Sequence, residues 1–97
     1  MVQNSVSPID TSYMVANDIL FREVENEGIL LHIASGTYYS LSETSVLFWQ
    51  ALSTQQPLEP VVNAIASEYD VTKEVIVADL ESFLKDLSEL GLITPAE

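Results

Sequence analysis

The chain has 97 residues, an apolar content of 47% and a formal net charge of −12. This length and composition are typical of one folded domain and exclude a disordered chain. With 3 basic residues against 15 acidic ones, the chain lacks the cations that a nucleic acid or an anionic membrane surface would require.

Residues 1–16 show no periodicity, and we expect a flexible N-terminal arm, partly folded back through Ile9, Tyr13 and Val15. Residues 17–97 are expected to form the single domain. The first residues lack the basic and apolar regions of a secretory signal, and no apolar run approaches the roughly 20 residues that span a bilayer. The expected location is therefore the cytoplasm, with no membrane partner.

Three short strands follow, over residues 19–24, 29–34 and 37–41. The first shows alternating side chains, and the third is rich in β-forming residues. We expect the turn that ends at Gly28 to use this glycine at positive φ, and Ser35 with Gly36 to make the second turn. Two short turns predict an antiparallel sheet of three strands.

The period then changes to that of helices. The change covers residues 41–52, where Ser42 is a good N-cap and Leu41, just before the cap, can pack on Val46 as a hydrophobic staple. Pro60 suits the first turn of a second helix. The order β-β-β-α-α-α predicts an α+β domain.

A third, longer helix is expected from its N-cap Thr72 to Gly91, which would end the helix in a Schellman motif. Apolar residues recur along it at helical spacing. The residues that we assign most firmly to the core are Trp49, Leu80, Leu84 and Leu87.

Few residues could support catalysis. His32 is the only histidine and lies within a strand, where a structural role is expected, and cysteine is absent. Glu23, Glu25 and Glu27 alternate along a hairpin edge and could gather a cation, but a solvated edge accounts for them. We therefore expect no catalytic residues, no metal site, no cofactor and no enzyme activity.

The third strand has the features of a binding edge. Residues 37–41 carry no charge and no proline, so their free backbone groups could accept an extended peptide as an added strand. The alternative is that Tyr38 and Tyr39 only bracket the sheet. Because strand neighbours point to opposite faces, one of the two is expected to face the core.

The chain also resembles a known family in a set of residues spread over positions 17–93. The residues that carry the resemblance are Gly36, Tyr38, Tyr39, Leu41, Thr44, Trp49, Leu52, Tyr69, Asp70, Val71, Val75, Asp79, Leu80, Phe83, Leu84, Leu87, Gly91, Leu92 and Ile93. Their order and spacing resemble the PqqD family, the peptide chaperones of pyrroloquinoline quinone biosynthesis. The same module is the recognition element for precursors of ribosomally made, modified peptides (RiPPs). Ser42 stands where the family often has Asn.

The resemblance implies a winged helix-turn-helix fold, with a three-stranded antiparallel sheet followed by three helices. It also implies that a precursor's leader peptide binds as a strand along the third strand, in a cleft against the third helix. The peptide-binding residues carried over are Thr37, Tyr38, Tyr39, Ser40 and Leu41 on the strand and Val75, Asp79, Ser82, Phe83 and Asp86 on the helix.

The implied partners are a leader peptide and the modifying enzyme or leader peptidase that receives it, as in lasso-peptide pathways. Nucleic acid is excluded, because the acidic third helix would be repelled by phosphate. The chain is expected to be a monomer or a weak homodimer, since an open edge strand can pair with its own copy.

Three alternatives remain open at this point. The chain could serve as a chaperone of the quinone pathway, or as a winged-helix scaffold that binds another protein through its helices without binding DNA. A metal-dependent enzyme that uses the hairpin acids Glu23, Glu25 and Glu27 is the third.

Overall fold

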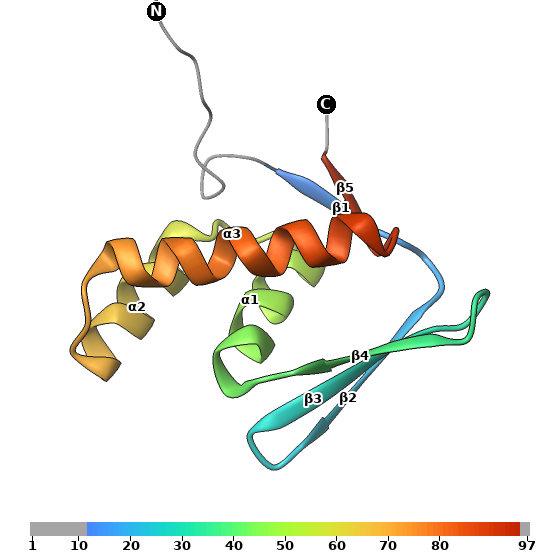
Figure 1. Cartoon of the computed structure of the whole chain (residues 1–97), viewed down its shortest axis with the longest axis horizontal. Coiled ribbons are helices and arrows are strands. Elements are labelled where there is room, and N and C mark those ends of the chain that lie inside the picture. The colour runs from blue at the N-terminus through green and yellow to red at the C-terminus, as the bar shows by residue number, and fades with distance from the viewer. Residues whose placement is uncertain (1–11, 96–97) are drawn as a thin grey trace, which may run out of the picture.

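The structure is a computed structural model of the chain, and it describes residues 12–95. Its elements are β1 (Tyr13–Val15), β2 (Ile19–Val24), β3 (Glu27–His32), β4 (Thr37–Leu41), α1 (Glu43–Ser53), α2 (Glu59–Tyr69), α3 (Lys73–Glu89) and β5 (Ile93–Pro95). In Figure 1 the sheet formed by β2, β3 and β4 lies on one side of the helices, and β1 lies beside β5 on the other. This order confirms the predicted α+β class, while the winged helix-turn-helix label stays a prediction.

The three-stranded sheet is antiparallel, with β3 in the middle. Leu30 of β3 lies opposite Phe21 of β2 and Tyr39 of β4, and its side chain is fully buried. Because side chains alternate along a strand, the residues in register with Leu30 face the helices, and their neighbours face the opposite side. The sheet thus has an inner, helix-facing side and an outer side.

A two-residue turn joins β2 to β3, and here the prediction for Gly28 is wrong. Glu25 supplies the positive φ, 59°, while Gly28 lies within β3. A Cβ built on Gly28 would come within 2.8 Å of Cε1 of Phe21 and 3.1 Å of Cγ2 of Val46. This glycine is therefore needed for the close packing of the sheet on α1.

Of the capping residues predicted for the helix starts, one makes its hydrogen bond and another does not. The Ser42 Oγ accepts a hydrogen bond from the backbone N–H of Ser45 at 3.3 Å, so the predicted N-cap of α1 is confirmed. Thr72 occupies the N-cap position of α3, but its side chain makes no capping hydrogen bond. Glu59 begins α2, one residue before the proline expected in its first turn.

The predicted Schellman motif ends α3. Gly91 adopts a φ of 76°. Its N–H donates to the carbonyl of Ser88 at 3.1 Å, and the N–H of Leu92 donates to the carbonyl of Leu87 at 2.9 Å. The reversal directs Leu92 and Ile93 back into the core, where both are buried.

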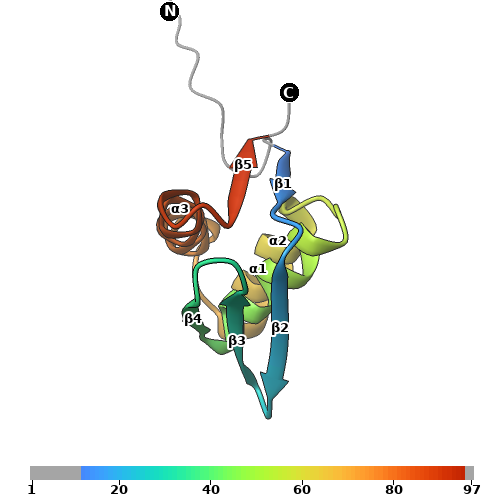
Figure 2. The same ribbon diagram turned by 90° about the vertical axis from the view of Figure 1, so that its right-hand side faces the viewer.

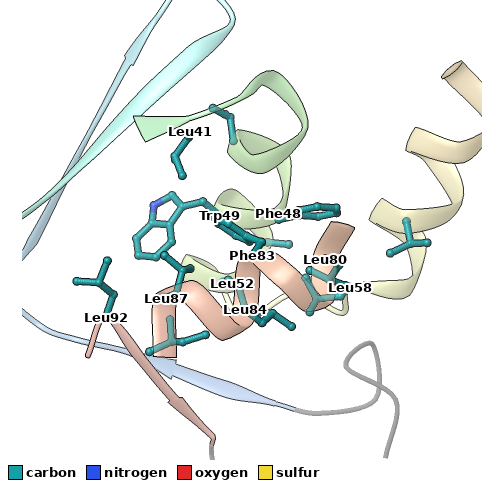
Figure 3. Packing of buried hydrophobic residues seen from close by; sticks show 14 of the residues in the cluster. Leu41, Phe48, Trp49, Leu52, Leu58, Leu80, Phe83, Leu84, Leu87 and Leu92 are labelled. Carbon is teal, nitrogen blue, oxygen red and sulfur yellow. The ribbon is translucent and has the colours of Figure 1, made fainter. Parts of the chain in front are cut away.

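The core lies between the inner side of the sheet and the three helices. Figure 3 shows Leu41 of β4, Trp49 of α1 and Leu87 of α3 directed into the same space. Trp49, Leu80, Leu84 and Leu87 are all buried, as predicted.

A short ribbon pairs the two ends of the described chain. Tyr13 lies opposite Pro95 and Val15 opposite Ile93 in the antiparallel pairing of β1 with β5. The expected arm of residues 1–16 is therefore paired over Tyr13–Val15, while residues 1–11, including Ile9, lie outside the described residues. Of the helices within residues 12–95, none combines the length and the apolar character needed to cross a membrane.

Candidate functional site

The strand β4 forms one edge of the sheet, on the side nearest α3, as Figure 2 shows. It is short, uncharged and free of proline. Within the described part of the chain its one strand neighbour is β3, so half of its backbone hydrogen-bonding groups have no partner in a described strand.

The pairing register identifies these free groups. The N–H of Ile33 donates to the carbonyl of Asp18 at 2.9 Å, which shows that the odd-numbered residues of β3 direct their backbone groups toward β2. Backbone groups alternate in direction along an antiparallel strand, so Leu30 and the other even-numbered residues bond to β4. Their partners include Tyr39. It follows that Tyr38 and Ser40 direct their N–H and carbonyl groups outward, toward the open edge.

The side chain of Tyr39 connects β4 to α3. Its hydroxyl donates a hydrogen bond to Oδ2 of Asp86 at 3.0 Å, and its ring lies 6.2 Å from that of Phe83, tilted by 44°. Phe83 in turn packs on Phe48 of α1, with ring centroids 5.9 Å apart. These contacts fix the spacing between the strand edge and the helix.

A cleft of about 230 Å³ opens beside this contact. We call it the β4–α3 cleft, and its lining residues are Tyr39, Ser42, Thr44, Ser45, Phe48, Asp79, Ser82, Phe83 and Asp86. Ligand sites for whole small molecules usually exceed 300 Å³, so this cleft is sized for single side chains.

The chemistry of the β4–α3 cleft is mixed. Phe48 and Phe83 are buried and supply an aromatic floor, and hydroxyl groups and two carboxylates surround it. Burial raises the pKa of Tyr39 above its ordinary value of 10.0, and the hydrogen bond to Asp86 and the charge of that carboxylate raise it further. Tyr39 therefore remains a neutral hydrogen-bond donor at physiological pH.

The structure brings together five of the ten predicted binding residues. Tyr39, Asp79, Ser82, Phe83 and Asp86 line the one cleft. Phe83 also belongs to the core, with an exposed fraction of 4%.

The other five predicted residues lie elsewhere. Tyr38 and Ser40 point their side chains to the outer side of the sheet, so they can contribute mainly backbone groups to the edge. Leu41 is buried in the core, Thr37 lies exposed at the start of β4, and Val75 is 50% exposed on α3 outside the cleft lining.

Sequence reasoning missed the contribution of α1 to the cleft. Ser42, Thr44, Ser45 and Phe48 belong to its N-cap and first turns, which follow β4 directly. The signal was present in the polar run after residue 41, but that run was interpreted as a capping sequence alone.

The single histidine has structural contacts. Nε2 of His32 lies 3.1 Å from Oδ1 of Asp18, and Nδ1 lies 2.8 Å from the hydroxyl of Ser35. These contacts tie the sheet to its adjoining turns. Within residues 12–95, no three His, Cys, Asp or Glu side chains are grouped so as to hold a metal ion.

Comparison with known proteins identifies relatives of this arrangement. The sequence profile of the family described as "Coenzyme PQQ synthesis protein D (PqqD)" matches residues 27–93. A search of curated proteins finds no match.

Two solved structures are similar to the chain. One is described as "TbiB1 in Complex with the TbiA(beta) Leader Peptide", with a TM-score of 0.75 and 28% identity over 86% of this chain and 96% of that one. The other, "Lasso peptide synthetase B1 complexed with the leader peptide", has a TM-score of 0.76 and 25% identity over 87% of this chain and 99% of that one.

Proposed function

This chain belongs to the PqqD family, and on that basis we propose that it binds the leader region of a ribosomally made precursor peptide during RiPP biosynthesis. The observation that carries the proposal is the open edge of β4 beside the β4–α3 cleft. An extended peptide would pair with the outward backbone groups of Tyr38 and Ser40.

Side chains of the added strand would alternate between the two sides of the sheet. Those on the inner side would meet the β4–α3 cleft, with Phe83 as its floor and Asp79, Ser82 and Asp86 along the helix. The backbone bonds would supply much of the affinity, and the cleft would select one or two side chains of the leader. Val75 would contact the leader farther along α3, while Thr37 and Leu41 would bound the strand.

Within the family, we propose the lasso-peptide type rather than the quinone pathway. Both similar solved structures are complexes with leader peptides, and one is described as a lasso peptide synthetase component. On this account the chain performs no chemistry of its own. It presents the bound precursor to a separate leader peptidase or modifying enzyme, in the cytoplasm.

A titration tests this proposal. Leader segments of candidate precursors, labelled with a fluorophore, would be titrated with the chain and followed by fluorescence anisotropy. We expect a dissociation constant below about 100 μM for the cognate leader, a free energy near −5.5 kcal/mol, and no binding of a scrambled leader. Failure of every candidate to bind in this range would contradict the proposal.

A competition experiment with the same leader separates this proposal from the scaffold alternative. If the chain served only as a scaffold that binds proteins through its helices, the partner protein would not occupy the β4 edge, and leader peptides would not compete with it. Partner binding would then be unaffected by saturating leader.

A further inference from the structure

The outer side of the sheet carries several large, exposed apolar side chains, and no other element within residues 12–95 covers it. We call it the outer face and define it by the large apolar side chains that point away from the helices. These are Leu20, Val24, Ile29, Leu31 and Tyr38. An antiparallel sheet with one solvated side normally carries polar residues there.

The register gathers these side chains into one patch. Leu20, Leu31 and Tyr38 lie directly opposite one another across the three strands. Leu20 is 56% exposed and Tyr38 69% exposed, so the row is open to solvent. In the next row Ile29, 42% exposed, lies between Arg22 and Ser40. Contiguous apolar patches of this kind mark interaction sites more often than isolated apolar residues do.

An acidic hollow adjoins one end of the outer face. It has a volume of about 560 Å³ and lies between the β2–β3 turn and the start of α1. Its lining includes Val24 and Ile29 of the outer face together with Glu25, Glu27 and Glu43, and no Lys or Arg of residues 12–95 lines it. A partner that covers both regions would need an apolar centre with basic side chains at one edge.

We propose that the outer face is the docking surface for the enzyme that acts on the bound precursor. This inference rests on the proposed function. A leader added to β4 would extend the outer face by one strand, because every second leader side chain would emerge beside Tyr38 and Ser40. The docked enzyme would therefore contact the chain and its leader at once, and would select the loaded state over the free one.

A second copy of the chain fits this surface less well. Each copy carries a net charge of −12, and the acidic hollow would repel another acidic chain. The enzyme proposed as partner thus carries Lys or Arg opposite Glu25, Glu27 and Glu43.

The test uses the full chain, its cognate leader and the processing enzyme encoded with them. Leader affinity is measured first by anisotropy, and enzyme binding to the leader-loaded chain is then measured by biolayer interferometry. Leu20→Glu and Ile29→Glu are expected to weaken enzyme binding at least tenfold while leaving leader affinity within about twofold. Leu47→Glu, at an exposed apolar residue of α1, is the matched control and should change neither value.

A second experiment tests the acidic hollow with the double variant Glu25→Gln, Glu27→Gln. Its enzyme binding should be weaker than wild type at low salt, and the difference should vanish in 0.5 M NaCl, where exposed charges are screened beyond about 4 Å. The control is Glu74→Gln with Glu81→Gln, on the exposed surface of α3.

The outcomes are distinct. If the wild-type chain does not bind leader at all, the proposed function fails. If leader binds and Leu20→Glu or Ile29→Glu retains wild-type affinity for the enzyme, docking on the outer face is overturned. If the wild type sediments as a dimer that Leu20→Glu dissociates, the face belongs to a second copy and the inference is equally overturned.

Discussion

At the scale of single residues, Tyr39 links the binding edge to the helix opposite. We expect Tyr39→Phe to lower the free energy of unfolding by about 0.5–1 kcal/mol at pH 7, because one half-buried hydrogen bond to Asp86 is lost. The pKa of Tyr39 is raised in the folded state, so its contribution is complete below pH 10.0 and disappears as the pH rises through the folded-state value. Urea unfolding of both proteins at pH 7 and pH 11 measures this.

The control for Tyr39→Phe is Asp86→Asn, which retains an acceptor for the hydroxyl but removes the charge. This variant should lose less stability and should bring the pKa of Tyr39 closer to its ordinary value. A difference between Tyr39→Phe and wild type that stays constant from pH 7 to pH 11 would show that the hydroxyl does not act as described.

Gly28 is the second residue with a specific physical role. Gly28→Ala should lower the free energy of unfolding by about 1–3 kcal/mol, because the new methyl group overlaps Phe21 and Val46. Phe21→Leu in the Gly28→Ala background removes the closest ring atom and should restore part of the loss. Urea denaturation of the single and double variants tests this, and a Gly28→Ala protein as stable as wild type would refute the overlap.

At the residue scale, contacts between residues that lie far apart in the sequence could not be predicted. Alternation on β4 indicated that Tyr38 and Tyr39 face opposite sides, but not which of them faces the core. That choice depends on the register with β3, and the contact of Tyr39 with Asp86 joins residues 47 positions apart. No local pattern reports such a pair. Gly28 was misinterpreted because a glycine after a polar run usually indicates the turn itself.

At the scale of elements, α2 ends at a residue, Asp70, whose backbone conformation glycine adopts more readily than aspartate. Asp70 adopts a left-handed backbone, with φ 56° and ψ 47°, while Val71 closes the turn by donating to Ala66 at 3.1 Å. Asp70→Gly should therefore raise stability by about 0.5–1 kcal/mol, and Asp70→Ala should lower it. In thermal unfolding, the Gly variant should have the highest melting temperature, the wild type with Asp an intermediate one, and the Ala variant the lowest. A lower melting temperature for the Gly variant would contradict this assignment.

The elements that sequence predicted well carry their own local signals. Strand β4 was predicted with its observed bounds, and Ser42 and Gly91 mark the ends of helices through local hydrogen bonds. The pairing of β1 with β5 was not predicted, because two three-residue strands from opposite ends of the chain have no periodicity of their own. β5 follows the turn that ends α3 and so lies far from β1 in the sequence.

At the scale of the whole molecule, the candidate site depends on how separate elements meet. The order of strands and helices, the acidic charge and the open edge of β4 follow from the sequence. The β4–α3 cleft does not, because α1 supplies part of its lining, and Phe48 of α1 packs on Phe83 of α3 there. The outer face follows from alternation only once the register of all three strands is known.

The central claim is that a leader peptide pairs with the backbone of β4, and Ser40 offers the most direct test. Ser40→Pro removes one outward N–H, at an edge position where proline is tolerated, and Ser40→Ala removes the side chain alone. Tyr38→Pro and Tyr38→Ala form a second pair, and circular dichroism confirms that each variant is folded. The measurement is the dissociation constant of the cognate leader by anisotropy. We predict at least a tenfold increase for the proline variants and a change within about twofold for the alanine variants, whereas folded proline variants that bind leader as tightly as wild type would contradict strand addition at this edge.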